Sequence, residues 1–177
     1  MFDPLDFYPT EPRLRELLLT HSSCVAKKAL EVSKKHPELN ADNDFLYRAA
    51  MLHDIGIVAC DAPGIYCFGS LPYICHGVEG ARMLAEHGML REALVCERHT
   101  GSGLTASEIE ENALPLPARD MLPVSIEEKI ICYADKFYSK NPDSLTAEKS
   151  IERIISEMQR HGEAPLQRFL SLHALLG

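Results

Sequence analysis

The stretch that decides the fold is residues 49–56, which read Ala-Ala-Met-Leu-His-Asp-Ile-Gly. An apolar helical pattern runs directly into an imidazole, His53, and a carboxylate, Asp54, and then reaches Gly56. Burying an ionised carboxylate without a partner costs a large free energy, so Asp54 should have a cation partner. The stretch therefore indicates a helix that carries a cation-binding group into the core.

Helical periodicity dominates wherever the chain shows a pattern, and no sustained alternation of apolar and polar residues indicates a strand. We therefore expect an all-α fold. The expected helices cover about residues 11–18, 21–36, 42–53, 76–88, 94–99, 126–137 and 147–176. Asp42 should cap the third helix, and the last segment should break at Gly162 and Pro165.

Two stretches are irregular: residues 60–73, which contain two prolines and two glycines, and residues 100–125, which contain three prolines. Within the second, a capping box at residues 105–108 should open a brief helical turn. Loops held by a rigid helical scaffold commonly carry binding specificity. We expect both stretches to rim a site.

Length and composition indicate a single cytoplasmic domain. The chain has 177 residues, of which 46% are apolar, enough to bury one core. With 26 acidic and 18 basic residues, the net charge is −8, so neither extended nucleic acid nor a membrane is an expected partner. The six cysteines form no Cys-x-x-Cys pair, which disfavours a disulfide scaffold or a zinc knuckle. We see no targeting or membrane-spanning segment, and no indication of the oligomeric state.

Six residues of metal-binding types follow one another in a defined order: His21, His53, Asp54, His76, His99 and Asp135. Their motifs are Thr-His-Ser-Ser-Cys-Val-Ala at 20–26, Leu-His-Asp-Ile-Gly at 52–56, His-Gly-Val-Glu-Gly-Ala at 76–81, Glu-Arg-His-Thr-Gly at 97–101 and Tyr-Ala-Asp-Lys at 133–136. This order resembles the HD-domain metal-dependent phosphohydrolases, specifically their HDIG-type members. The resemblance covers about residues 14–140. It implies one HD-domain helical bundle over residues 1–177, which the helices of 147–176 complete.

Helical spacing places four of these residues beside apolar neighbours. The pairs, each four residues apart, are His21 with Val25, His53 with Ala49, His99 with Val95, and Asp135 with Ile131. On a helix this spacing puts both members on one face, so the ligands should point together into the bundle core. Histidine and carboxylate donors without cysteine suit Fe, Mn, Zn, Ni or Mg, and the sequence does not distinguish among them.

The resemblance implies a dinuclear centre. In the family's pattern His21, His53, Asp54 and Asp135 hold one divalent ion, and His76 and His99 hold a second that Asp54 bridges. His53 and Asp54 would be the catalytic pair. Two such ions generate a hydroxide from a shared water and neutralise phosphoryl charge, so the nucleophile would be a metal-bound hydroxide.

Each candidate also has a structural reading, because a single histidine on a core-facing helix is more often a hydrogen-bonded structural residue. Four further histidines, His36, His87, His161 and His173, are left out of the site; three of them precede a helix end, where a cation has an ordinary electrostatic role. Candidate substrate-binding residues are Arg98, Lys136 and Lys140, for each of which a solvated side chain is the alternative.

One position departs from the pattern. Many HD-type hydrolases carry a lysine three residues after the aspartate of the pair, and here that residue is Ile57. A Gly-Tyr-Pro signature of the cyclic-di-GMP class is also absent from the sequence. The resemblance thus disfavours a cyclic dinucleotide, and a phosphate-binding cation must come from elsewhere.

The favoured function is a phosphohydrolase that cleaves a phosphoester of a small metabolite, with a nucleotide as the first choice. The alternatives are an HD-type diiron oxygenase, which would use the same ligands, and a non-catalytic metal-stabilised sensor or interaction module. Oxygen consumption would separate the oxygenase from the hydrolase.

Overall fold

The computed structural model describes residues 4–177, and this part of the chain is mostly helical. The α-helices are α1 (Pro12–Lys35), α2 (Asn43–Leu52), α3 (His76–Glu86), α4 (Leu90–Arg98), α5 (Ala106–Glu111), α6 (Ile126–Asp135), α7 (Ile151–His161) and α8 (Glu163–Leu176). Short 3-10 helices cover Pro4–Phe7, Pro37–Leu39, Ile55–Ala59, Pro63–Ile65, Tyr73–Cys75 and Pro142–Ser144. Two strands, β1 (Asp61–Ala62) and β2 (Cys67–Phe68), pair in antiparallel register. The expected all-α class is confirmed apart from this pair, which is too short to show an alternating pattern.

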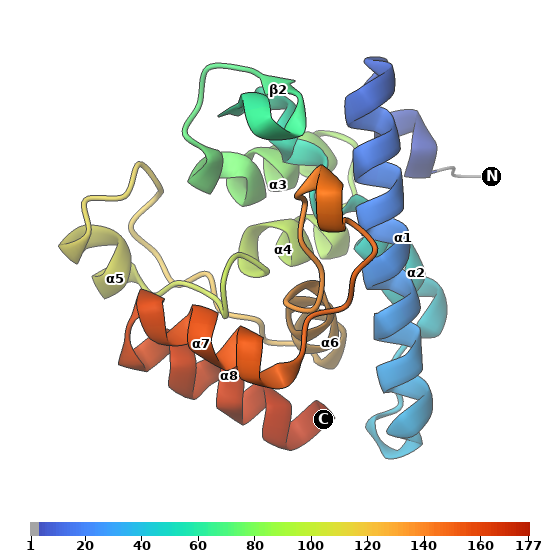
Figure 1. Cartoon of the computed structure of the whole chain (residues 1–177), viewed down its shortest axis with the longest axis vertical. Helices are drawn as coiled ribbons and strands as arrows, with labels where there is room; N and C mark the ends of the chain where they lie inside the picture. Colours follow the sequence, from blue (N-terminus) through green and yellow to red (C-terminus); the bar gives the residue numbers. More distant parts are fainter. Residues whose placement is uncertain (1–3) are drawn as a thin grey trace.

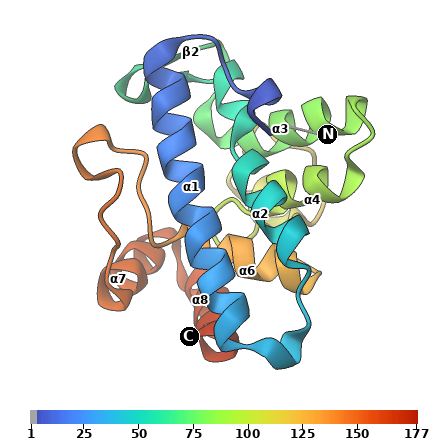
Figure 2. The same ribbon diagram turned by 90° about the vertical axis from the view of Figure 1, so that its right-hand side faces the viewer.

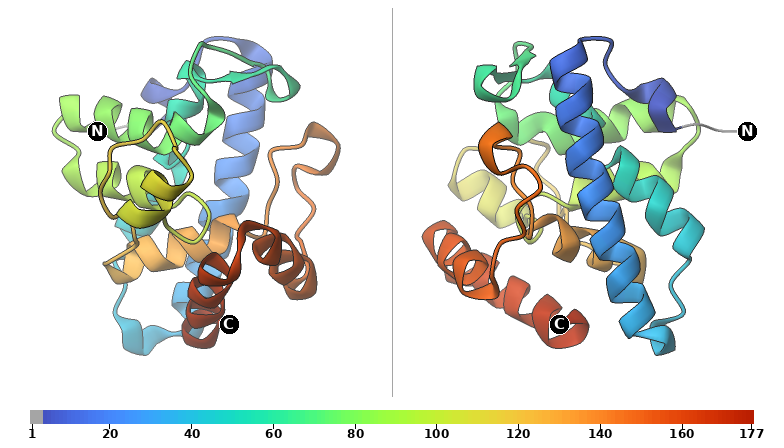
Figure 3. Two further views of the ribbon diagram at one scale, coloured as in Figure 1. Left: turned by 90° about the vertical axis from the view of Figure 1, so that its left-hand side faces the viewer. Right: turned by 45° about the vertical axis from the view of Figure 1, so that its right-hand side comes forward.

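Helix α1 runs along one side of the molecule and packs on α2 and α6 (Figures 1 and 2). Helices α3 and α4 pack on each other, and α4 also contacts α2 and α6. The pair α7 and α8 lies at one end, where α8 contacts α6 (Figure 3). Helix α6 is therefore central and packs on α1, α2, α4 and α8. Among residues 4–177, no helix combines the length and apolar character needed to cross a bilayer.

The N-terminal third contains one long helix where the sequence analysis expected two. Glu11 caps α1 by accepting a hydrogen bond from the Leu14 amide at 2.6 Å, and Pro12 occupies the first turn. The helix then continues without a break through residues 20–23, which include one threonine and two serines of modest helix propensity. The apolar face of α1, which continues with Val25, is buried against α2 and α6. This burial overrides the modest helix propensity of residues 20–23. The expected boundary near His21 is wrong.

Several local predictions agree with the structure. Asp42 caps α2 through a 3.0 Å hydrogen bond from the Phe45 amide. Thr105 and Glu108 form the expected reciprocal capping box of α5. The break between α7 and α8 falls at Gly162, whose φ of 117° favours glycine. Pro165, by contrast, lies in the first turn of α8, where its missing N–H costs nothing, and does not break the helix.

Close contact at Gly56 fixes how the turn after α2 meets α3. A β-carbon on Gly56 would lie 2.0 Å from the carbonyl oxygen of His76 and 2.3 Å from the backbone nitrogen of Gly80. These are backbone atoms, which cannot rotate aside. The missing side chain at Gly56 therefore lets residues 53–54 approach the start of α3.

We expect Gly56→Ala to lower the free energy of unfolding by about 3 kcal/mol, because the new methyl group overpacks against backbone. Gly64→Ala is the matched control, since nothing lies within 4 Å of a β-carbon at that exposed position. Urea unfolding of both variants measures the difference. Equal midpoints for Gly56→Ala and the wild type would contradict the contact.

Candidate metal centre

The six candidate ligands come from five parts of the chain and are all buried: His21, His53, Asp54, His76, His99 and Asp135. Only His21 lies in the middle of a helix, α1. The others sit at helix ends: His53 and Asp54 directly follow α2, His76 opens α3, His99 directly follows α4, and Asp135 closes α6. The structure brings the six together, although most do so from helix ends and not from helix faces as the spacing suggested.

The ligand atoms form two groups that share one residue. The first group is His21, His53, Asp54 and Asp135, and the second is Asp54, His76 and His99, with the donor atoms of each group within 4.8 Å of one another. Either group has the donor types and burial to hold a divalent ion.

Asp54 faces the two groups with different oxygens. Its Oδ2 lies 3.1 Å from Nε2 of His21 and 3.0 Å from Nε2 of His53. Its Oδ1 lies 3.5 Å from Nε2 of His76 and 3.3 Å from Nε2 of His99. One carboxylate can therefore bridge two cations.

Backbone carbonyls orient three of the four imidazoles. Nδ1 of His53, His76 and His99 lies 2.6, 2.7 and 2.8 Å from the carbonyl oxygen of the residue three positions earlier, respectively Ala50, Tyr73 and Cys96. Such contacts assign the proton to Nδ1 and leave the Nε2 lone pair for a cation. A local helical turn thus sets the tautomer that a metal ligand needs.

Polar atoms in the cluster face one another without satisfying hydrogen bonds. Within residues 4–177, Oδ1 of Asp54 is buried and has no hydrogen-bond partner. Nε2 of His76 lies 3.2 Å from Nε2 of His99, and the Nδ1 contacts make both of these nitrogens acceptors. Oδ1 of Asp54 faces the same two nitrogens at 3.5 and 3.3 Å. Three acceptors that converge without a donor are costly in the core, so this group fits a bound cation.

Electrostatics in the cluster keep the second group ready to bind a cation. Burial lowers the pKa of His76 to about 3 and also lowers the pKa of His99, so both imidazoles are neutral. Burial alone would raise the pKa of Asp54, but His53 and Lys140 hold it well below its usual value. Asp54 is therefore an ionised carboxylate beside two neutral imidazoles, which is the ligand state that metals require.

In the first group His53 behaves differently. Burial would lower its pKa, but the carboxylates of Asp54 and Asp135 outweigh burial and raise the pKa of His53 to about 9. A bound divalent ion would therefore have to displace a proton from His53, which makes metal affinity rise with pH.

Two lysines reach the carboxylates. Nζ of Lys140 lies 2.6 Å from Oδ2 of Asp54, and the Lys140 side chain is only 14% exposed. Burial opposes the charge, yet Asp54 raises the pKa of Lys140 well above its usual value. Nζ of Lys136 lies 2.8 Å from Oδ2 of Asp135. Lys140 is therefore the cation partner that the sequence predicts for Asp54. The alternative prediction, a solvated Lys140 side chain, is wrong.

Arg98 does not join the centre. Its guanidinium pairs with Glu128 at 2.9 Å, and Glu128 also accepts a hydrogen bond from the Val124 amide. Arg98 ties α4 to the start of α6 and is absent from the lining of the adjoining pocket. Arg98 is next to His99 in sequence, but α4 ends at Arg98. Helical spacing therefore did not predict which way the Arg98 side chain points.

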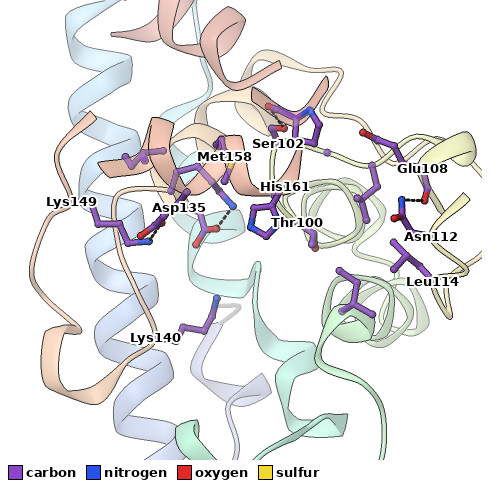
Figure 4. Close-up of a pocket in the computed structure, with 18 of the residues that line it drawn as sticks. Thr100, Ser102, Glu108, Asn112, Leu114, Asp135, Lys140, Lys149, Met158 and His161 are labelled. Atoms are coloured by element: carbon purple, nitrogen blue, oxygen red, sulfur yellow. Dashed lines mark hydrogen bonds and ion pairs between the residues drawn. The ribbon is translucent and has the colours of Figure 1, made fainter. Parts of the chain in front are cut away.

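A pocket of about 510 Å³ adjoins the cluster through Asp135, Lys136 and Lys140 (Figure 4). Its other walls are residues 100–104 with part of α5, and the helix α7. The irregular stretch 100–125 lines the pocket, as expected, whereas residues 60–73 do not. The latter stretch contributes Tyr73, whose ring stacks on His76 at 4.7 Å. Helix α7, including His161, forms a wall that the sequence pattern did not predict.

A family profile described as the HD domain matches residues 18–140. The chain belongs to the HD domain family. Its mostly helical fold with a buried His/Asp cluster is therefore an HD bundle, and α7 and α8 lie beyond the matched region of this HD domain.

Among relatives, an uncharacterized protein of Methanocaldococcus jannaschii is 35% identical over 123 residues, which are 68% of this chain and 65% of that protein. Two proteins named tRNA (cytidine(56)-2'-O)-methyltransferase are also similar. The one from Picrophilus torridus is 32% identical over 125 residues, and the one from Thermoplasma volcanium is 27% identical over 163 residues. These matches cover 70% and 91% of this HD domain chain but only 32% and 42% of the two relatives. The chain thus spans less than two thirds of each relative. No solved structure gives a significant match.

We expect the metal-saturated HD domain to hold two divalent ions per chain. His99→Ala removes a donor from the second group only, so the content should fall from two toward one. Asp54→Ala removes the shared donor and should bring it toward zero. Metal analysis by mass spectrometry measures this, with His87→Ala, an exposed histidine in neither group, as the control. A single ion per saturated wild-type chain would contradict the shared arrangement.

Proposed function

We propose that this HD domain is a metal-dependent phosphohydrolase that cleaves a phosphoester of a small metabolite. The observation that carries the proposal is that both oxygens of one buried carboxylate, Asp54, face separate donor groups beside a pocket. Two divalent ions held there would activate a water and neutralise charge on a phosphoryl oxygen. His21, His53, Asp54, His76, His99 and Asp135 would hold them.

Lys140 and Lys136 would bind the phosphate. Both line the pocket, and both already contact ligand carboxylates, so a phosphate placed at the centre lies within their reach. The position that carries a lysine in many related hydrolases is Ile57, which is fully buried in the core. Lys140, from the segment after α6, supplies the missing cation from a different part of the fold.

A small substrate suits the pocket and the charge. A volume of about 510 Å³ is in the range of small-molecule sites, and a nucleotide is the substrate that we favour. Two relatives are named tRNA methyltransferases, which makes RNA the competing substrate. The excess of 26 acidic over 18 basic residues opposes contact with a long polyanion. We therefore propose a phosphorylated metabolite as the partner and no extended nucleic acid.

The test offers the metal-loaded protein a panel of nucleotides, sugar phosphates and short RNA, and measures released inorganic phosphate for the first two and chain shortening on a gel for the RNA. We expect turnover of at least one small ester, and loss of more than 100-fold in Asp54→Ala because the shared metal ligand is gone. An oxygen electrode run on the same samples tests the diiron oxygenase alternative, which needs the same ligands. Oxygen uptake without phosphate release would replace the hydrolase by the oxygenase. If the protein showed neither activity, the non-catalytic sensor or interaction module would be favoured.

A second prediction concerns Lys140. Lys140→Met should raise KM about tenfold, because a charge-assisted hydrogen bond to phosphate is lost. It should also destabilise the metal-free protein by about 3 kcal/mol, since Asp54 loses its ammonium partner, and leave the metal-loaded protein close to wild type. Kinetics and thermal unfolding with and without chelator measure both effects. Lys34→Met, an exposed lysine at the end of α1, is the control. Unchanged KM and unchanged apo stability would remove Lys140 from the site.

A further inference from the structure

Helix α7 presents one face to the pocket. Ile154, Met158 and His161 all line it and lie four and three residues apart, which places them on a single stripe of the helix. Ile154 and Met158 are buried and anchor this stripe. His161 ends it, so its direction follows from the packing of two side chains earlier in the same helix.

Most polar side chains around the pocket already have partners. Nζ of Lys149 lies 2.7 Å from Glu157, and the Glu108 carboxylate accepts from Arg168 at 2.8 Å. Ser102 donates to the carbonyl of Pro165 at 2.8 Å. Within residues 4–177 His161 has no hydrogen bond, ion pair or ring contact, and it is an exposed residue in the pocket lining. Its imidazole is thus available to a ligand.

The pocket has two chemically different regions. Asp135, Lys136 and Lys140 mark the end at the metal centre, whereas Leu104, Leu114, Ile154 and Met158 line the rest with apolar surface. Figure 4 draws His161 among the side chains that line the pocket, with Asp135 toward one side of the view and Asn112 and Leu114 toward the other. A molecule with its phosphate at the metal centre would place its organic group against α7 and His161.

We propose that the stripe of Ile154, Met158 and His161 is a subsite for a planar ring in the organic group of the substrate, with the His161 imidazole packed against that ring. The inference rests on the proposed phosphohydrolase function for the position of the phosphate. It assigns substrate choice to a helix outside the matched residues 18–140. A flat imidazole beside apolar side chains favours an aromatic ring over an alkyl group. The substrate class is therefore a phosphate ester of a ring-bearing alcohol.

Two non-hydrolysable probes isolate the ring. Phenylphosphonate and methylphosphonate share the phosphonate head, so the ratio of their Kd values for the metal-loaded protein, from calorimetry, reports contacts to the ring alone. We expect the wild type to prefer phenylphosphonate at least tenfold, from burial of the ring. His161→Ala should reduce that preference about fivefold without changing methylphosphonate affinity, metal content or melting temperature.

Two further variants complete the test. Arg160→Gln changes the exposed neighbour, which does not line the pocket, and should keep the full preference. His161→Phe keeps a ring face and should also keep it. The subsite would be overturned if the wild type showed no preference for phenylphosphonate over methylphosphonate, or if His161→Ala kept that preference in full. Equal losses of the preference in His161→Ala, His161→Phe and Arg160→Gln would also overturn it.

The ring subsite and the phosphohydrolase proposal can be overturned independently of each other. A ring preference that depends on His161 in a protein that hydrolyses no ester would overturn the hydrolase and keep the subsite. Ester hydrolysis without that preference would overturn the subsite and keep the hydrolase.

Discussion

One constraint underlies the rest of the structure: the charge of Asp54 lies in the dry core and must be compensated by cations. Every element that contributes to the centre brings either a donor that can share a cation with Asp54 or a positive charge that pairs with it directly. An ion pair in this position is a weak source of net stability, because desolvation offsets much of the attraction. The arrangement is better explained as preparation for a ligand than as a device for stability.

Helix ends explain how so many donors reach one place. A histidine at a helix end can give its Nδ1 proton to a carbonyl three residues earlier, which the structure shows at His53, His76 and His99. The same contact satisfies a backbone acceptor and aims Nε2 at the centre. Gly56 then allows the turn that carries Asp54 to approach α3 at backbone distance. Local geometry and a single close contact thus assemble both donor groups.

The segment after α6 and helix α7 add what the donor cluster lacks. Lys140 brings a buried positive charge to Asp54, and Lys149 fixes the returning chain through its amide hydrogen bond to the carbonyl of Phe137 at 2.8 Å. Helix α7 then covers one side of the pocket. In our proposals, the chemistry belongs to the bundle of residues 18–140 and the selection of the organic group belongs to the C-terminal helices.

The sequence by itself determined the helical class, the family, the caps at Asp42 and Thr105, and the order of the residues that gather around Asp54. These follow from short-range rules, since periodicity, capping and motif order are legible within a few residues. Only the tertiary structure decided the directions of Arg98, Lys140 and His161. Arg98 turns to Glu128, thirty positions away, Lys140 lies beyond the end of α6 where helical spacing no longer applies, and His161 faces the pocket because Ile154 and Met158 are buried. Side-chain direction outside a regular helix depends on partners distant in sequence, and those partners are defined only when the chain is packed.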